Sequence, residues 1–293
     1  MRRRIVGTWI AAVLGAVGAV AAPSAMAATG GPVHPGVQTF TAGGQCTANF
    51  IFADARNTYI GQAAHCAGLG AAKNTNGCTA ASRPLGTPVT VTGASRPGTL
   101  AYSSWLTMQA KGETNPDACA FNDLALVRLH PSDVDKVDPS VPGFGGPTGV
   151  RGAGVGSTIF SFGNSSLRLG LAPLSPKQGL VLSVDGGGWS RSVYTVTPGV
   201  PGDSGSGFMN AAGQAVGVLS TLALLPLPLS NGVGDLGRQL TYMRASSTLG
   251  DVKLVRGTTP FKGDLVGAVL NGRSVASRLS GRRLRASVGG LLG

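Results

Sequence analysis

Three short segments of this 293-residue chain carry side chains that could act together in a hydrolytic reaction. In chain order they contain His65 within residues 63–66, Asp123 at the head of an apolar run, and Ser204 within residues 202–207. A serine hydroxyl is a weak nucleophile until a base takes its proton, and the base needs a carboxylate to orient it. Histidine suits the role of base because its ordinary pKa of about 6.5 lies near neutral pH. We therefore predict that His65, Asp123 and Ser204 form one catalytic group.

The glycines around Ser204 predict a sharp turn of the backbone at that residue. Attack by a serine on a carbonyl group leaves a negative oxygen, which needs hydrogen-bond donors close by. The backbone N–H groups of Gly202 and Ser204 are the predicted donors.

Each of these segments has an ordinary structural explanation when it is taken alone. A histidine beside a cysteine is usually structural, Gly-Asp-Ser-Gly is a common turn, and an aspartate at the head of a strand is often a cap. All three together, in this order, favour the chemical explanation. The other two histidines, His34 and His130, have no such set of partners and are predicted to be structural.

The motifs AAHC, DLALV and GDSGSG, in that order, resemble those of the chymotrypsin-like serine peptidases, and the resemblance covers roughly residues 40–250. The order His, Asp, Ser differs from the subtilisin-like and α/β-hydrolase orders. The serine motif is more similar to that of bacterial members than to the GDSGGP of animal ones. The arginine, alanine and glycine content also resembles that of actinobacterial proteins.

The resemblance implies an all-β fold of two antiparallel six-stranded β-barrels packed face to face, with a C-terminal helix. Short β-branched or aromatic runs between turn residues agree with this in both halves of the chain. Proline and glycine crowd residues 138–154, which we expect to link the two halves. Leucines and a methionine near helical spacing predict the closing helix at 235–247.

The start of the chain predicts export. Arginines at 2–4, an apolar run at 5–20 and Ala25-Met26-Ala27 together have the pattern of a cleavable signal peptide over residues 1–27. A short N-terminal segment at 28–44 is then expected, followed by a first barrel at 45–140 and a second barrel with the helix at 141–250.

The last segment, 251–293, is expected to be a basic tail, because much of the net charge of +12 lies there. The tail could contact an anionic cell envelope or could be a loose solvated extension. Nucleic-acid binding is not expected, because basic residues are not interleaved with aromatic ones.

The four cysteines of an exported chain predict two disulfides. A zinc site is disfavoured, because no close Cys-x-x-Cys pair occurs. In the resembling family, the cysteine after the catalytic histidine pairs with one about twenty residues upstream. This implies Cys46–Cys66 and leaves Cys78 with Cys119.

The resemblance also implies residues that contact the substrate. Pro198 falls at the floor of the primary pocket, where an aspartate would select arginine or lysine, so a trypsin-like preference is not expected. Ser220, Thr221 and Leu222 resemble the substrate-pairing strand, with Ser220 near Asp123. An apolar or small substrate side chain is the resulting expectation. The buried partner of Asp203 is not identified by the sequence.

These observations together predict a secreted, monomeric serine endopeptidase that cuts polypeptides through an acyl-enzyme and needs no metal or cofactor. The alternatives are an esterase with the same three residues, and a catalytically silent protease-fold module that binds the cell envelope. Reading Gly186–Gly188 as a phosphate loop is weaker, because no strand-to-helix context surrounds it.

Overall fold

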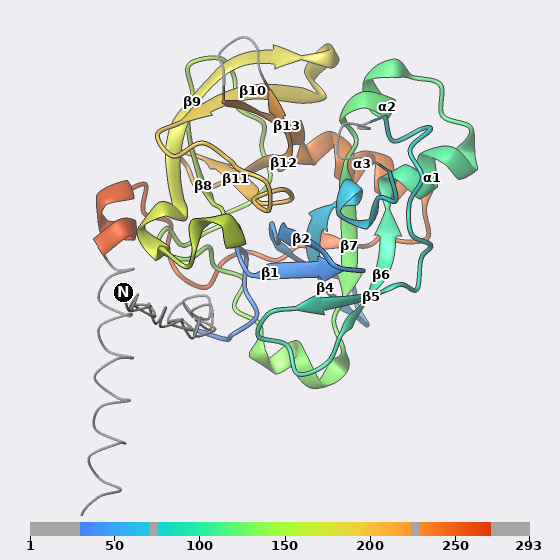
Figure 1. The fold of residues 1–293 in the computed structure, drawn as a ribbon, viewed down its shortest axis with the longest axis horizontal. Coiled ribbons are helices and arrows are strands. Elements are labelled where there is room, and N and C mark those ends of the chain that lie inside the picture. Colours follow the sequence, from blue (N-terminus) through green and yellow to red (C-terminus); the bar gives the residue numbers. More distant parts are fainter. Residues whose placement is uncertain (1–29, 71–75, 224–228, 271–293) are drawn as a thin grey trace, which may run out of the picture.

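The structure is a computed structural model, and it describes residues 30–70, 76–223 and 229–270. The expected signal peptide at 1–27 therefore lies outside the described residues. Two β-rich units follow one another along the chain, as Figure 1 shows with the first in blue and green and the second in yellow and orange. No helix in these described ranges is long and apolar enough to cross a membrane.

The first unit is an antiparallel sheet of eight strands in the order β14-β3-β4-β7-β6-β5-β1-β2. Its strands are β1 (Gln38–Thr41), β2 (Gly44–Thr47), β3 (Ile51–Ala53), β4 (Thr58–Ala63), β5 (Pro88–Val91), β6 (Gly98–Ser103), β7 (Leu124–Arg128) and β14 (Lys253–Leu254). This open order differs from the closed six-stranded barrel that we expected. Its two outer strands are β2, which pairs with β1, and β14, from the C-terminal segment, which pairs with β3.

The second unit is a closed barrel of six strands in the order β10-β13-β12-β11-β8-β9. Its strands are β8 (Thr158–Phe162), β9 (Pro176–Asp185), β10 (Ser190–Thr195), β11 (Gly207–Asn210), β12 (Ala215–Ala223) and β13 (Ser230–Asp235). Closure leaves no unpaired edge, so each of these strands is bonded on both sides. This unit has the form that the sequence predicted.

A helical segment at 265–270 ends the described structure. The other helices of the described residues are three α-helices and five short 3-10 helices. They are α1 (Ser104–Lys111), α2 (Pro116–Phe121), α3 (Leu236–Ser246), η1 (Ala64–Ala67), η2 (Pro131–Lys136), η3 (Ser166–Arg168), η4 (Ala172–Leu174) and η5 (Gly186–Gly188). The closing helix α3 begins where the sequence predicted, because the Asp235 side chain accepts a hydrogen bond from the N–H of Arg238. Leu236, Leu240 and Met243 are the buried face of α3. The helices α1 and α2 were not predicted.

The segment boundaries differ from expectation at both ends of the chain. The segment expected at 28–44 contains β1, which pairs with β2 and β5 inside the first sheet. The segment from residue 251, which we expected to be a tail, begins with folded residues: Val252 is fully buried, and β14 follows it. Phe261 then packs its ring edge-to-face on Phe160 of β8, with ring centroids 5.5 Å apart. Residues 271–293 lie outside the described residues.

One hydrophobic cluster is shared between the two units. It contains Phe50 and Tyr59 from the first sheet, Met209 and Val218 from the barrel, and Leu240 from α3. Because these residues are in contact across the unit boundary, the two units are held at a fixed distance from each other. Side chains from both units can therefore form one site.

Candidate active site

The pairing of β4 with β7 brings His65 and Asp123 together. Ala63, the last residue of β4, lies opposite Leu124, the first residue of β7. His65 follows that end of β4 by two residues, and Asp123 precedes β7 by one. The N–H of Ala64 also donates to the backbone carbonyl of Asp123 at 3.1 Å. The register of one strand pair thus places the imidazole beside the carboxylate.

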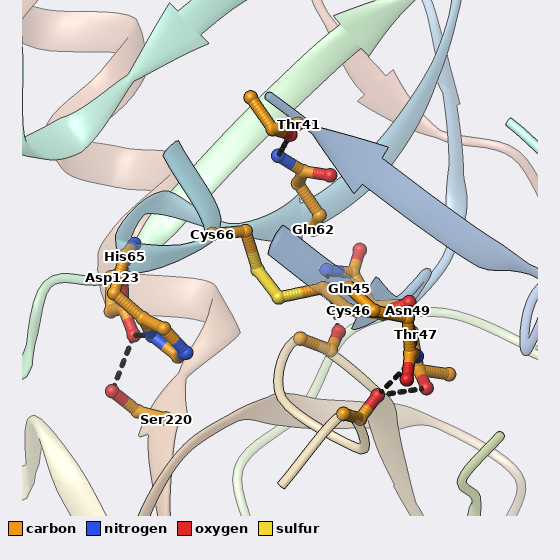
Figure 2. Close-up of a disulfide and its surroundings, with 12 residues drawn as sticks. Thr41, Gln45, Cys46, Thr47, Asn49, Gln62, His65, Cys66, Asp123 and Ser220 are labelled. Atoms are coloured by element: carbon orange, nitrogen blue, oxygen red, sulfur yellow. Dashed lines mark hydrogen bonds and ion pairs between the residues drawn. A yellow bond between two sulfur atoms is a disulfide. The ribbon is translucent and has the colours of Figure 1, made fainter. Parts of the chain in front are cut away.

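The Asp123 carboxylate accepts three hydrogen bonds, and Figure 2 shows the group. Its Oδ2 accepts from Nδ1 of His65 at 2.6 Å, and its Oδ1 accepts from the His65 backbone N–H at 2.8 Å. The hydroxyl of Ser220, on β12 of the second unit, donates to Oδ2 at 2.5 Å. Asp123 is 3% exposed, so these donors replace its water. The expected proximity of Ser220 to Asp123 is therefore present.

The same carboxylate controls the charge state of His65. Burial of the ring lowers its pKa, but the charge and hydrogen bond of Asp123 outweigh burial, so the pKa of His65 is raised above the ordinary value of 6.5. Because Nδ1 is taken by Asp123, Nε2 is the ring nitrogen left for a substrate or nucleophile. The His65 side chain keeps 24% of its surface exposed, so the ring reaches solvent.

The loop that carries Ser204 lies directly against the strands that precede His65. The carbonyl of Ser204 accepts from the N–H of Thr47 at 2.8 Å, and the hydroxyl of Thr47 donates to the carbonyl of Gly202 at 2.8 Å. A Cβ atom on Gly205 would lie 2.6 Å from the carbonyl oxygen of Thr47 and 2.8 Å from the nitrogen of Ala63. With a φ of +88°, position 205 therefore requires glycine on two grounds. This close approach brings Ser204 to the end of β4.

The disulfide between Cys46 and Cys66 closes the same corner of the molecule, as Figure 2 shows. It joins β2 to η1, the 3-10 turn that contains His65. The second disulfide joins Cys78 to Cys119. Both are the pairs that the resemblance implied.

Cys46, Cys66 and His65 have ligand atoms within 4.8 Å of one another, but this is not a metal site. The two sulfurs are bonded to each other, and a metal needs free thiolates. The bonded sulfurs are the disulfide that the sequence favoured over a zinc site.

Two backbone N–H groups of the Ser204 loop remain without acceptors. Gly202 has a φ of +96°, which only glycine adopts easily. Within the described part of the chain, neither the N–H of Gly202 nor that of Ser204 donates a hydrogen bond. Free, closely spaced N–H groups are what a developing oxyanion requires. Gly202 and Ser204 remain the predicted donors.

Asp203, between these two residues, has the buried partners that the sequence did not identify. Its Oδ2 lies 2.5 Å from Nη2 of Arg168 and 3.1 Å from Nζ of Lys177, and Asp203 and Lys177 are fully buried. Its Oδ1 accepts from the N–H of Ser165 at 3.0 Å. Burial would raise the pKa of Asp203, but Lys177 and then Arg168 outweigh it, so the pKa is lowered. The loop is thus anchored by an ionised carboxylate between two cations.

Replacing Asp203 with asparagine is expected to destabilise the protein by about 3–5 kcal/mol at neutral pH, because two buried cations lose their counter-charge. Because the pKa of Asp203 is lowered in the folded protein, the carboxylate stabilises the fold at pH values above the ordinary aspartate pKa of about 3.9. This stabilisation is lost as the pH falls below that value. The stability difference between wild type and Asp203→Asn should therefore shrink from pH 5 downward. Urea unfolding at several pH values measures it.

The exposed Asp135→Asn is the matched control for this measurement and should leave stability within about 0.5 kcal/mol at every pH. An Asp203→Asn protein as stable as the wild type at neutral pH would contradict the anchoring role of the carboxylate.

The remaining residues expected to contact a substrate lie on two segments. The carbonyl of Pro198 accepts from Nη2 of Arg168 at 3.0 Å and lies 3.3 Å from Nζ of Lys177. Thr221 and Leu222 belong to β12, where they lie opposite Gly232 and Asn231 of β13. The side chain of Leu222 lies outside the described residues. Lys177, Arg168 and Asn231 are the residues of this region that sequence reasoning missed.

Comparison with known proteins finds similarity at the level of structure. No family model matches the chain, and no curated protein matches it. Thermobifida fusca Protease A is 19% identical with a TM-score of 0.49, and the match covers 77% of this chain and 99% of that one. The Nocardiopsis protease NAPase is 16% identical with a TM-score of 0.49, covering 76% and 98% of the two chains.

Cellulomonas bogoriensis chymotrypsin is 18% identical with a TM-score of 0.46, covering 76% of this chain and 98% of that one. At these identities and TM-scores the similarity carries no inference about catalysis. The chain is similar in structure to these proteases, and a proposal about its function rests on its own side chains.

Proposed function

We propose that this chain is a secreted serine endopeptidase in which Ser204, His65 and Asp123 form the catalytic triad. The observation that carries the proposal is the contact of His65 Nδ1 with Asp123 Oδ2 at 2.6 Å, at the corner where the Ser204 loop is bonded to Thr47. An imidazole oriented by a buried carboxylate, close to a loop of the other unit that carries a serine, supports the arrangement that acyl transfer needs.

The reaction would proceed in two halves. The Oγ of Ser204 attacks the carbonyl carbon of a peptide bond while Nε2 of His65 takes the hydroxyl proton. The N–H groups of Gly202 and Ser204 stabilise the negative oxygen. His65 then gives its proton to the amine nitrogen, the C–N bond breaks, and an ester to Ser204 remains. Water attacks the ester with His65 again as base, and the carboxylic acid leaves as Ser204 recovers its proton.

We also propose that the chain acts outside the cell. The pattern of residues 1–27 is that of an exported precursor, and two disulfides suit an oxidising compartment. Because residues 251–270 pack on the folded units, contact with an anionic envelope would involve the arginines of 271–293.

Labelling with a fluorophosphonate tests the proposal, because this reagent forms a covalent bond with an activated serine. The mature protein should be labelled once, at Ser204, and should cleave peptide amide substrates. Ser206→Ala is the matched control, since it removes a hydroxyl from the same loop and should leave labelling intact. Absence of labelling in folded protein would favour the silent binding module, and labelling with cleavage of esters alone would favour the esterase.

The pH dependence of kcat/KM provides a second test. His65 must be neutral to accept a proton, and its pKa is raised by Asp123, so activity should rise with pH and reach half its maximum above pH 6.5. The same raised pKa stabilises the fold below the ordinary histidine pKa, and this stabilisation is lost as the pH rises through the folded pKa. A profile that is flat, or that has its midpoint below 6.5, would contradict His65 as the base.

A further inference from the structure

Asn231 connects the two segments that are expected to contact a substrate side chain. It lies in β13, opposite Leu222 of β12, and its Oδ1 accepts a hydrogen bond from the N–H of Gly199 at 2.9 Å. Gly199 directly follows Pro198, the expected floor of the primary pocket. Asn231 is 1% exposed, although it carries a polar amide. It is thus a buried polar group between the strand and the floor segment.

The bond from Gly199 fixes which end of the amide is the oxygen. A backbone N–H can be accepted by Oδ1 and not by Nδ2, so the amide is oriented by its neighbour. A Cβ atom at Gly199 would lie 2.8 Å from Nδ2 and 2.9 Å from Oδ1, so glycine leaves room for the amide to lie flat against the backbone. The orientation of Asn231 is therefore set on one side by a hydrogen bond and by close packing.

The other end of the same amide has no partner. Among the described residues, Nδ2 of Asn231 donates no hydrogen bond, whereas buried polar groups in folded proteins are normally bonded. The residue is 1% exposed, so a substrate side chain that covers this amide without offering an acceptor would leave its N–H groups unpaired. A substrate side chain that reaches Gly199, next to the expected pocket floor, would supply such an acceptor with its oxygen.

The cations that contact the Pro198 carbonyl also favour a neutral or anionic substrate side chain. Nζ of Lys177 lies 3.3 Å from the carbonyls of Thr197 and Pro198, and Arg168 also donates to Pro198. Among the described residues, Asp203 is the one carboxylate in ion-pair contact with either cation, so the cluster keeps one net positive charge. Burial lowers the pKa of Lys177 to about 8, against the opposing charge of Asp203, so it is largely protonated at neutral pH. A cationic substrate side chain would be repelled there.

We infer that the site selects substrates whose side chain on the acyl side of the cleaved bond carries an oxygen acceptor, and that Asn231 is the residue that recognises it. Glutamine and glutamate have the chemistry that fits, and lysine and arginine are excluded. This inference rests on the proposed function. It replaces the apolar or small side chain that the sequence led us to expect.

A series of peptide anilides that differ only in this side chain tests the inference. Glutamine and methionine are the informative pair, because they have similar length and volume and differ in the acceptor. We expect kcat/KM for glutamine to exceed that for methionine by about tenfold or more, because methionine leaves the Asn231 donor unpaired. Glutamate should be cleaved at least as well as glutamine, and lysine should be the poorest of the four.

Variants at position 231 assign the preference to this residue. Asn231→Ala should bring the glutamine-to-methionine ratio close to one, and Asn231→Asp should shift the preference toward lysine. Gln178→Ala is the matched control, since it removes a half-buried amide of β9 that has no side-chain hydrogen bond among the described residues and should keep the ratio. Fluorophosphonate labelling counts the active sites of each variant, so that misfolded protein does not enter the ratio.

The failure of this inference can be distinguished from that of the proposed function. A labelled wild type that cleaves after methionine as well as after glutamine, or an Asn231→Ala protein that keeps the wild-type ratio, overturns the inference and leaves the endopeptidase proposal intact. Folded wild-type protein that is neither labelled nor active on any of the four substrates overturns both.

Discussion

Replacing Ser204 with alanine is expected to lower kcat for peptide hydrolysis by on the order of 10⁴-fold or more and to leave KM within a few-fold of wild type. The substitution removes the oxygen that forms the acyl-enzyme but keeps the backbone N–H groups of Gly202 and Ser204. Residual activity should therefore come from a water that uses His65 and those donors. Single-turnover kinetics with a chromogenic peptide, with enzyme in excess, measures so small a rate.

The control for this variant is two residues along the same loop. Ser206 is fully buried, and among the described residues its Oγ has no hydrogen-bond partner, so Ser206→Ala loses no bond. It should retain kcat within a few-fold, which would show that the loop tolerates the loss of a hydroxyl. If Ser204→Ala keeps more than about a hundredth of wild-type kcat, another nucleophile performs the reaction, because a triad serine contributes far more.

The contact of His65 with Asp123 could be predicted from the sequence because each of these two residues lies close to the end of an apolar strand. His65 follows an apolar strand by two residues, and Asp123 precedes another by one. The antiparallel pairing of β4 with β7 brings the two ends together, and the order of the motifs, which resembles that of the peptidase family, implied this contact. Ser204 could be predicted because its turn needs glycines, and glycines are visible in a sequence.

The partners of Asp203 and the amide of Asn231 could not be predicted, because they depend on contacts between distant strands. A lysine in a strand is usually solvent-exposed, and no local pattern marks Lys177 as buried. Its burial follows from closure of the barrel, which turns one face of β9 inward. Asn231 lies outside every motif, and its hydrogen bond from Gly199 joins two residues that are 32 positions apart in the sequence.

The C-terminal segment shows how composition can mislead about structure. Its net positive charge led us to expect a basic tail, either in contact with an anionic envelope or loose in solvent, yet Val252, Phe261 and Ala268 pack on the two units. Leu254 and Leu265 pack on the same cluster, and because these few apolar residues are spread among polar and basic ones, the composition does not show where the segment lies. Their burial requires the hydrophobic surface that the rest of the fold supplies. The position of the C-terminal segment is therefore set by its few apolar residues and not by its net charge.

Replacing Asp123 with asparagine is expected to lower kcat at neutral pH by about 10⁴-fold, nearly as much as loss of the nucleophile. The carboxylate accepts from the His65 backbone N–H, from Nδ1 of His65 and from the hydroxyl of Ser220. An asparagine amide has one oxygen and one NH₂ group, so it cannot accept at both positions. Wherever the NH₂ group faces His65 Nδ1, it forces the ring into the tautomer that carries its proton on Nε2, and Nε2 then cannot accept the proton of Ser204.

Ser220→Ala is the comparison that separates charge from packing at this position. It removes one donor to Oδ2 but keeps the carboxylate and both contacts to His65, so we expect a loss of about tenfold or less in kcat. The acid limb of the pH profile should also move toward lower pH in Asp123→Asn, because the charge that raises the pKa of His65 has gone. Equal losses in the two variants, or an unmoved limb, would contradict the role of Asp123. The expected losses differ because the two groups have different roles. The Ser220 hydroxyl only adjusts the position of the carboxylate, whereas the carboxylate sets the His65 tautomer on which proton transfer depends.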